Sequence, residues 1–308
     1  MISPRSACAA LLFSVAFFHA AGGDLTAKDV VNQEPASQGT PISWETEASF
    51  SGVFGSDFKG VKDTGKVEAL DTELRLLALI PTHDGGPQLR FGFDLQRFDF
   101  SRPDSTPLPS SLESLAFVLG MDFQYGSDWI GRFEVKPGFY GSNNEIRGRD
   151  FNAPVNLGVS YIVNADLQLI VGLSVDANRK YPFIPAVGAR WKFAPDWVLN
   201  AVLPAPRLEY TLNSSLTLYA GADFQGDTYH TSDVPGDSHR AHRLDDAIVD
   251  YTQIRVGAGT SWSINNQFTV ELEAGFVPIH DFDFHRADGE LRSKDVPPYA
   301  GISLKAEF

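Results

Sequence analysis

The sequence predicts an all-β protein, an antiparallel up-and-down transmembrane β-barrel of about 14 strands, with about 12 as the alternative. Three observations lead to this fold class. Apolar and polar residues alternate with a period of two from Ile42 to Phe308, the connections between these segments are alternately long and short, and all five tryptophans fall on the short-turn side.

The composition argues against several classes of protein. The 308 residues include 39 acidic and 25 basic side chains, a net charge of −14, so the chain is not built to bind nucleic acid. Aromatic residues make up 12% of the chain, which is enough apolar surface to form a buried core and argues against a disordered protein. A single cysteine excludes a disulfide-stapled scaffold. No run of 18 apolar residues follows the N-terminal region, so no conventional transmembrane helix is expected.

The N-terminus has the three parts of a secretory signal peptide. Arg5 precedes an apolar stretch from Cys8 to Phe18, and small residues follow from Ala20 to Gly23. We therefore expect a signal peptide over residues 1–22, a periplasmic segment over 23–41 and the barrel domain over 42–308. Cys8 precedes the apolar core, which argues against a lipid anchor, and the mature chain contains no cysteine.

The strands follow one another with the same alternation. In the first, Ile42, Trp44 and Phe50 share one face while Glu45 and Glu47 occupy the other. The segments begin near residues 42, 67, 88, 114, 129, 154, 167, 183, 197, 206, 216, 251, 267 and 298. Those over 70–80 and 88–100 have impure faces, and the one around residue 210 is short. These weak segments leave the lower strand count open.

The connections alternate in length, as an up-and-down barrel with one short-turn side and one long-loop side requires. Short turns are expected at residues 81–87, 126–128, 164–166, 194–196, 213–215 and 265–266. Longer loops are expected at 55–66, 101–113, 142–153, 226–250 and 278–297, with a further loop around 179–182. One connection departs from this rule. Pro204-Ala205-Pro206 is short where a long loop is due.

The five tryptophans indicate a membrane interface. Each falls on the apolar register of its own strand, close to a short turn; they are Trp44, Trp129, Trp191, Trp197 and Trp262. Indole rings at one level of a barrel form the aromatic belt of a membrane interface. The alternative is a general preference of tryptophan for strand ends, which would permit a soluble barrel.

The last strand carries a family resemblance. Ala300, Ile302, Leu304 and Ala306 alternate with polar residues and lead to Phe308, which resembles the assembly signal of bacterial outer-membrane barrels. The stretches that begin at Phe183, Leu203 and Leu218 resemble an uncharacterised family of Gram-negative outer-membrane barrels, a domain of unknown function. The resemblance implies an integral outer-membrane location. It also implies contact with outer-membrane lipid and lipopolysaccharide, and assembly by the barrel-assembly machinery.

The polar register would face the lumen and is rich in charge. The candidate lumen-facing residues are Glu45, Glu47, Glu73, Arg75, Arg90, Asp94, Arg132, Glu134, Lys136, Arg190, Glu209, Arg255, Glu271 and Glu273. Opposite charges across a lumen can form a bracing network of ion pairs. The acidic excess also fits a passive channel for small solutes or cations. A non-conducting structural or surface-binding barrel is the alternative.

An enzyme is the third and weakest hypothesis. No mid-strand histidine accompanies a serine, so no catalytic residues are assigned. His280 and His285 lie close to Asp281 and Asp283, but this alternation equally describes a strand that extends above the membrane. In the loop 226–250, His239 and His242 among acids could take a divalent cation, but no known metal motif is present. No cofactor and no resident metal are expected.

Overall fold

The computed structural model describes residues 42–59, 66–83, 85–103, 106–232, 244–287 and 289–308. These residues form one antiparallel sheet and a single short 3-10 helix, η1 (Gly148–Asp150). The strand segments are β1 (Ser43–Ser56), β2 (Phe58–Lys59), β3 (Val67–Pro81), β4 (Gln88–Ser101), β5 (Ser111–Tyr125), β6 (Trp129–Val135), β7 (Gly138–Ser142), β8 (Phe151–Asn152), β9 (Val155–Asn164), β10 (Leu167–Val175), β11 (Phe183–Ala194), β12 (Trp197–Asn200), β13 (Arg207–Asn213), β14 (Leu216–Gln225), β15 (Thr228–His230), β16 (Ile248–Ser263), β17 (Phe268–Phe284), β18 (Gly289–Ser293) and β19 (Pro298–Glu307).

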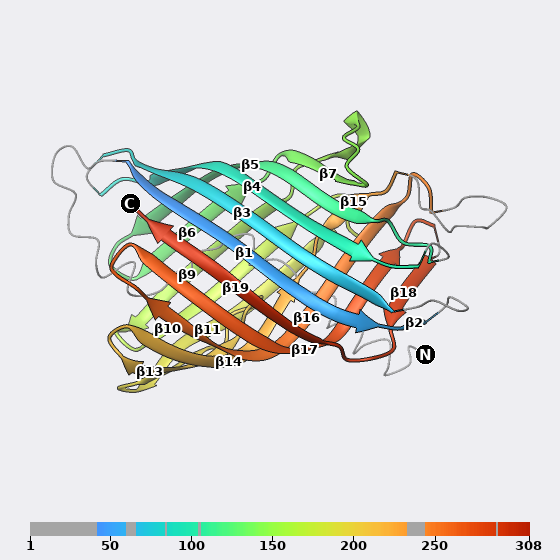
Figure 1. The fold of residues 1–308 in the computed structure, drawn as a ribbon. Helices are drawn as coiled ribbons and strands as arrows, with labels where there is room; N and C mark the ends of the chain where they lie inside the picture. Colours follow the sequence, from blue (N-terminus) through green and yellow to red (C-terminus); the bar gives the residue numbers. More distant parts are fainter. Residues whose placement is uncertain (1–41, 60–65, 84, 104–105, 233–243, 288) are drawn as a thin grey trace, which may run out of the picture.

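The sheet closes on itself as a barrel (Figure 1). The last strand, β19, pairs with β17 on one side and with β1 on the other, from Glu45 opposite Glu307 to Val53 opposite Tyr299. Fourteen strands make the wall. In this count β6 and β7 are one strand, because both pair with β5 and only a short interruption near Pro137 separates them. The predicted fold class and strand count are confirmed.

The strands begin close to where alternation places them, and short turns and long loops lie at opposite ends. Backbone hydrogen bonds between Trp44 and Phe308, each 2.9 Å from N to O, fix the start of β1 and the end of β19 at the short-turn end. At the opposite end, β2, β15 and β18 extend the sheet beyond the regular wall. The first and last strands are therefore joined at the short-turn end, and additional strand segments extend the wall at the long-loop end.

The outer face of the barrel is apolar. Phe117, Val171 and Ile302 each have about half or more of their surface exposed, and they point away from the lumen with the rest of the apolar register. In water, such an apolar surface would need a protein partner to cover it, whereas the hydrocarbon of a membrane solvates it directly. No helix in the described ranges is long and apolar enough to cross a membrane.

The long-loop half of the interior is filled by an aromatic core. Phe98 and Phe100 of β4 pack against Tyr251 of β16 and Phe282 of β17, with ring centroids 4.6 to 5.5 Å apart. All four side chains are buried. The core is completed by Val53, Phe58, Val67, Ala69, Leu108, Leu112, Ala116, Tyr140, Tyr229, Ala247, Val249, Val277, Phe284, Leu291 and Tyr299. The expected strand extension around His280 therefore carries part of this core.

The segment after β14 closes the mouth of the barrel above this core. The ring centroids of Tyr229 of β15 and Tyr140 of β7 lie 6.4 Å apart, and the Ser232 backbone N–H donates to Ser142 Oγ at 2.8 Å. Strands β14 and β7 belong to opposite parts of the wall, so β15 reaches across the lumen. Axial passage at this end is consequently filled by protein.

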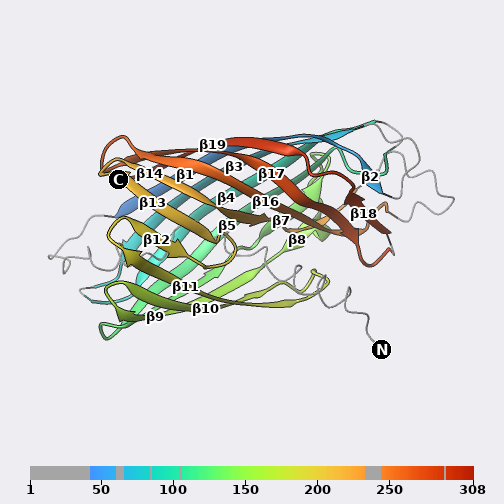
Figure 2. The same ribbon diagram turned by 90° about the horizontal axis from the view of Figure 1, so that it is seen from below.

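Two strands are much shorter than their neighbours. β12 and β13 have four and seven residues, and Figure 2 shows them ending well before β11 and β14. Asn200, the last residue of β12, pairs with Arg190, and Arg207, the first of β13, pairs with Gly221. The exceptional connection at Pro204 thus joins two strands that cover only part of the wall's height.

Candidate functional site

An ion-pair network braces the wall formed by β1, β3, β4, β5 and β6. Arg75 Nη2 lies 2.8 Å from Glu134 Oε2, and both side chains are buried. Arg90 bridges Asp122 at 3.1 Å and Glu45 at 3.0 Å. These groups come from five strands that are consecutive in the sheet, so their pairing depends on the curvature of the sheet around the lumen. Buried charges of this kind are tolerated only when paired.

The network continues toward the long-loop end. Lys136 Nζ lies 2.5 Å from Asp94 Oδ2, beside Arg75 at 4.0 Å. On the neighbouring wall Arg255 of β16 lies 3.1 Å from Asp71 of β3. The alternation predicts that these residues share the inner face, but not which pairs form.

A second group of charges lies on β11, β13, β17, β19 and β1. Arg207 lies 2.8 Å from Glu209 and 3.9 Å from Glu271, and Lys305 lies 3.6 Å from both Glu271 and Glu47. Arg190 is 4.0 Å from Glu209. Glu273 accepts a hydrogen bond from the hydroxyl of Tyr299.

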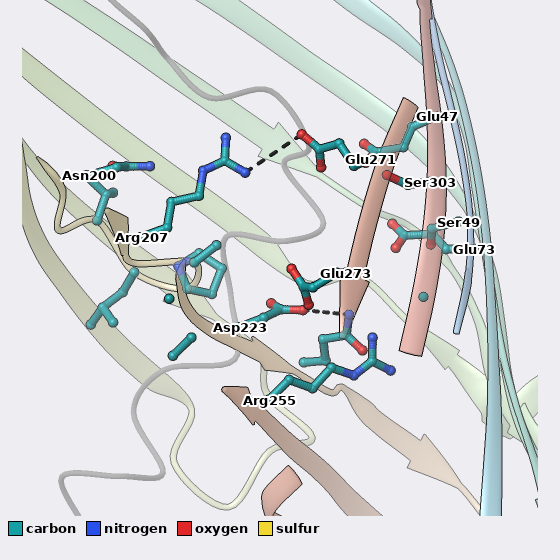
Figure 3. A pocket seen from close by; sticks show the side chains of 18 of the residues that line it. Glu47, Ser49, Glu73, Asn200, Arg207, Asp223, Arg255, Glu271, Glu273 and Ser303 are labelled. Carbon is teal, nitrogen blue, oxygen red and sulfur yellow. Dashed lines mark hydrogen bonds and ion pairs between the residues drawn. The ribbon is translucent and has the colours of Figure 1, made fainter. Parts of the chain in front are cut away.

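A cavity of about 220 Å³ lies between the two groups (Figure 3). Six carboxylates and five cationic side chains line it: Glu47, Glu73, Glu134, Asp223, Glu271 and Glu273 with Arg132, Arg190, Arg207, Arg255 and Lys305. Arg132 also pairs with Asp122, and Arg255 with Asp71, behind the lining. The cavity therefore has a modest acidic excess.

The fourteen candidate residues occur in the ion pairs or in the cavity lining described above. Arg207, a cavity residue, is absent from the predicted set although Glu209 is in it. Arg207 follows Pro206 at the start of a short strand, where the alternation has only begun. The spacing Arg207-x-Glu209 was the available signal for this residue.

The five tryptophans lie on the outer face, 38 to 53% exposed, on strands close to the short turns. The ring centroids of Trp197 and Tyr210 lie 4.8 Å apart and those of Trp129 and Tyr161 lie 4.7 Å apart, both pairs being tilted. Phe308 is exposed and lies 5.5 Å from Phe268. Their arrangement is that of an aromatic belt around one end of a barrel.

The histidines of the enzyme hypothesis do not share a site. His280 is buried in the aromatic core, where Nε2 lies 3.0 Å from the hydroxyl of Tyr251. His285 faces Asp250 at 3.5 Å and His230 faces Asp150 at 3.3 Å. His239 and His242 lie outside the described residues, as do the expected signal peptide and periplasmic segment. In the described ranges, no group of three ligand-type side chains is placed to hold a metal ion.

The mouth-closing segment carries a titratable carboxyl. Desolvation, followed by the nearby Asp176 carboxylate, raises the pKa of Asp227 to about 7. Asp227 Oδ1 accepts the Thr228 backbone N–H at 2.8 Å, a bond that an asparagine could also accept.

We expect the Asp227→Asn substitution to remove a pH dependence of stability. An unfolded Asp has a pKa near 4, so the folded state binds the extra proton between about pH 4 and 7, and wild-type stability falls as pH rises through this window. The variant should match the wild type near pH 4 and exceed it at pH 8 in urea unfolding midpoints. A wild-type midpoint that rises across this window would contradict the assignment. Asp245→Asn, in the same long connection, is the control.

Comparisons with known proteins agree with this architecture. The model of the family described as Domain of unknown function (DUF6268) matches residues 117–290, more than half of the chain. No curated protein sequence matches. Among solved structures, a deltaS2S3 mutant of the TodX monoaromatic hydrocarbon channel has 12% identity and a TM-score of 0.52, with 87% of this chain and 91% of that chain covered. The COG4313 outer membrane channel from Pseudomonas putida F1 has 13% identity and a TM-score of 0.45, with 90% and 98% covered.

At such identities the first of these structures supports the fold alone. The family match is different in kind, since it includes the stretches from Phe183 to Ala222 on which the sequence resemblance rests. The fold and the apolar outer surface together support a place in the outer membrane. This chain belongs to the family Domain of unknown function (DUF6268).

Proposed function

We propose that this protein is a passive outer-membrane channel for small solutes, with a modest preference for cations. The observation that supports the proposal is the cavity inside the barrel, lined by six carboxylates and five cationic groups. A barrel that serves only as a membrane anchor has no need of such a cavity. An acidic excess in a confined lumen raises the local concentration of cations.

Measurements of conductance test the proposal directly. The refolded protein in a planar bilayer should conduct, and its reversal potential in a KCl gradient should show a cation preference that weakens as salt rises toward 1 M, where the screening length is about 3 Å. An anion preference in the wild type would refute the electrostatic argument.

We expect the double substitution Glu271→Gln and Glu273→Gln to abolish or reverse the cation preference. It leaves four carboxylates facing five cationic side chains in the cavity lining. The matched control is Glu145→Gln with Glu290→Gln, which removes the same charge from exposed positions that do not line the cavity, before η1 and in β18. An equal shift of the reversal potential in both pairs would mean that the cavity is not on the ion route.

A non-conducting barrel is the second candidate, and the filled long-loop half favours it. The aromatic core and β15 occupy the lumen at that end, so an axial route requires their movement. Absence of conductance in wild type and in the double variant, with folding intact, would support this candidate and refute the channel.

A further inference from the structure

The wall of the barrel is incomplete beside the cavity. Beyond Asn200 and Arg207, β12 and β13 no longer separate β11 from β14. In the described part of the chain, residues 183–188 of β11 pair with β10 on one side and with no strand on the other. Since strands lie about 4.8 Å apart, two missing strands leave a gap on the order of 10 Å or more in the wall.

This gap has a complete frame, which we call the side window. Residues 183–187 of β11 form one side, and Gln225, the last residue of β14, borders the other. The connection 201–206 forms the lower edge, where it lies against Gly188 and pairs with Ala222 and Phe224. At the upper edge, the β10–β11 loop reaches the far strands: the Lys180 backbone N–H donates to Asp250 at 2.9 Å and Lys180 Nζ lies 2.6 Å from Asp283. The side window is therefore an opening within the wall, held above and below.

The side window lies at the level of the membrane. β11 has twelve residues and carries outward apolar groups along its length, from Phe183 through Val187 to Trp191. A membrane-spanning strand needs about 9–11 residues, so β11 crosses the whole hydrocarbon layer. Trp191 lies near the short-turn interface, which places Val187 near the middle of the hydrocarbon layer and Phe183 toward the long-loop side. These two residues are 68% and 67% exposed beside the side window.

The frame carries few unpaired backbone donors. An unpaired N–H in hydrocarbon costs several kcal/mol, which normally forbids an open strand edge there. Pro185, Pro204 and Pro206 have no N–H, and the carbonyls of the last two accept the N–H groups of Phe224 and Ala222 at 3.2 and 2.9 Å. These prolines reduce the cost of an unpartnered edge at this depth.

The side window leads into the cavity. Val202, Pro204 and Ala205 on its lower edge, and Gln225 on its β14 side, also line the cavity. Among the inward residues of β11, Ile184 is buried and Ala186 and Gly188 are half-buried. The cavity thus comes nearest to the side window beside Ala186 and Gly188, whereas the aromatic core fills the axial direction.

We propose that the side window joins the cavity to the membrane leaflet beside it, and that small molecules with an apolar body and one polar group pass through it. The outer rim is apolar, at Val187 and Leu203, and the cavity behind it offers Asp223 and Arg207 to a polar group. The inference rests on the proposed function as a passive channel and names its substrate class.

An apolar aryl diazirine dissolved in the bilayer tests this route. In a Cys8→Ser background the full chain has no other thiol, so the Ala205→Cys variant can be blocked after folding with a bulky maleimide. Photolysis followed by peptide mapping should show labels on cavity residues such as Tyr219 and Asp223 before blocking, and several-fold fewer after it. Labels on the outer wall should persist. Val171→Cys, on the outer face of β10 and blocked in the same way, should leave cavity labelling unchanged.

The outcomes separate the route from the channel itself. Cavity labelling that is absent, or unaffected by the block at residue 205, would overturn the side window, since the probe would then enter only from water or not at all. Absent labelling in a protein that purifies as an oligomer would overturn the route as well, since a second copy would then cover the gap. Cavity labelling that depends on residue 205, in a protein without ionic conductance, would support the route and reject the cation channel.

Discussion

Replacing Arg75 with methionine is expected to destabilise the barrel by about 3–5 kcal/mol, because the change leaves Glu134 buried with its closest charge partner removed. Arg90 Nε, 4.0 Å from Glu134 Oε2, compensates only in part, since it already serves Glu45 and Asp122. Urea unfolding in lipid vesicles, followed by the mobility of unheated samples in gel electrophoresis, measures the effect.

Two further variants make this test specific. Arg97→Met removes an arginine on β4 whose side chain is 34% exposed and pairs with Asp99, so its loss should cost below about 1 kcal/mol. Adding Glu134→Gln to Arg75→Met removes the uncompensated charge and should recover much of the loss. Equal effects of Arg75→Met and Arg97→Met would refute the bracing role of the buried network.

The second large effect concerns adjacent residues on β19. Ile302→Arg places a charge in hydrocarbon near the middle of the strand, at a cost of about 2–4 kcal/mol. Ser303→Arg points into the cavity beside Glu47 and Glu271, and should cost much less. Folding titrations into lipid vesicles measure both. Equal tolerance of the two substitutions would mean that the barrel does not expose this face to lipid.

The sequence predicts the strands of the barrel wall better than the side-chain contacts inside the lumen. Alternation is a local property, so strand starts and the inner or outer face of residues such as Glu45 and Ile302 follow from it. The pairing of Arg75 with Glu134 depends on the order of strands around the ring and on side-chain reach across the lumen. No local pattern contains this information, because 59 positions separate the two residues.

The aromatic core was missed for a related reason. Phe282 and Phe284 alternate with polar residues as lipid-facing residues do, and the pattern alone cannot tell an apolar lumen from an apolar outer surface. The side window had a signal in the unexpectedly short connection at Pro204. Its meaning required the lengths of β11 and β14 on either side.

The hydrogen bonds between Trp44 and Phe308 bring the first and last strands together at one end of the barrel. A short linker joining these two residues, with a new break at the exposed loop near Asn144, would give a circular permutant that keeps every strand pair. Such a permutant should refold in detergent micelles. Its linker would follow Phe308 directly, so delivery to the outer membrane in cells would report separately on the assembly signal that this last strand resembles. The pairing of β1 with β19 thus makes it possible to test which features of the chain are needed for folding and which for delivery to the membrane.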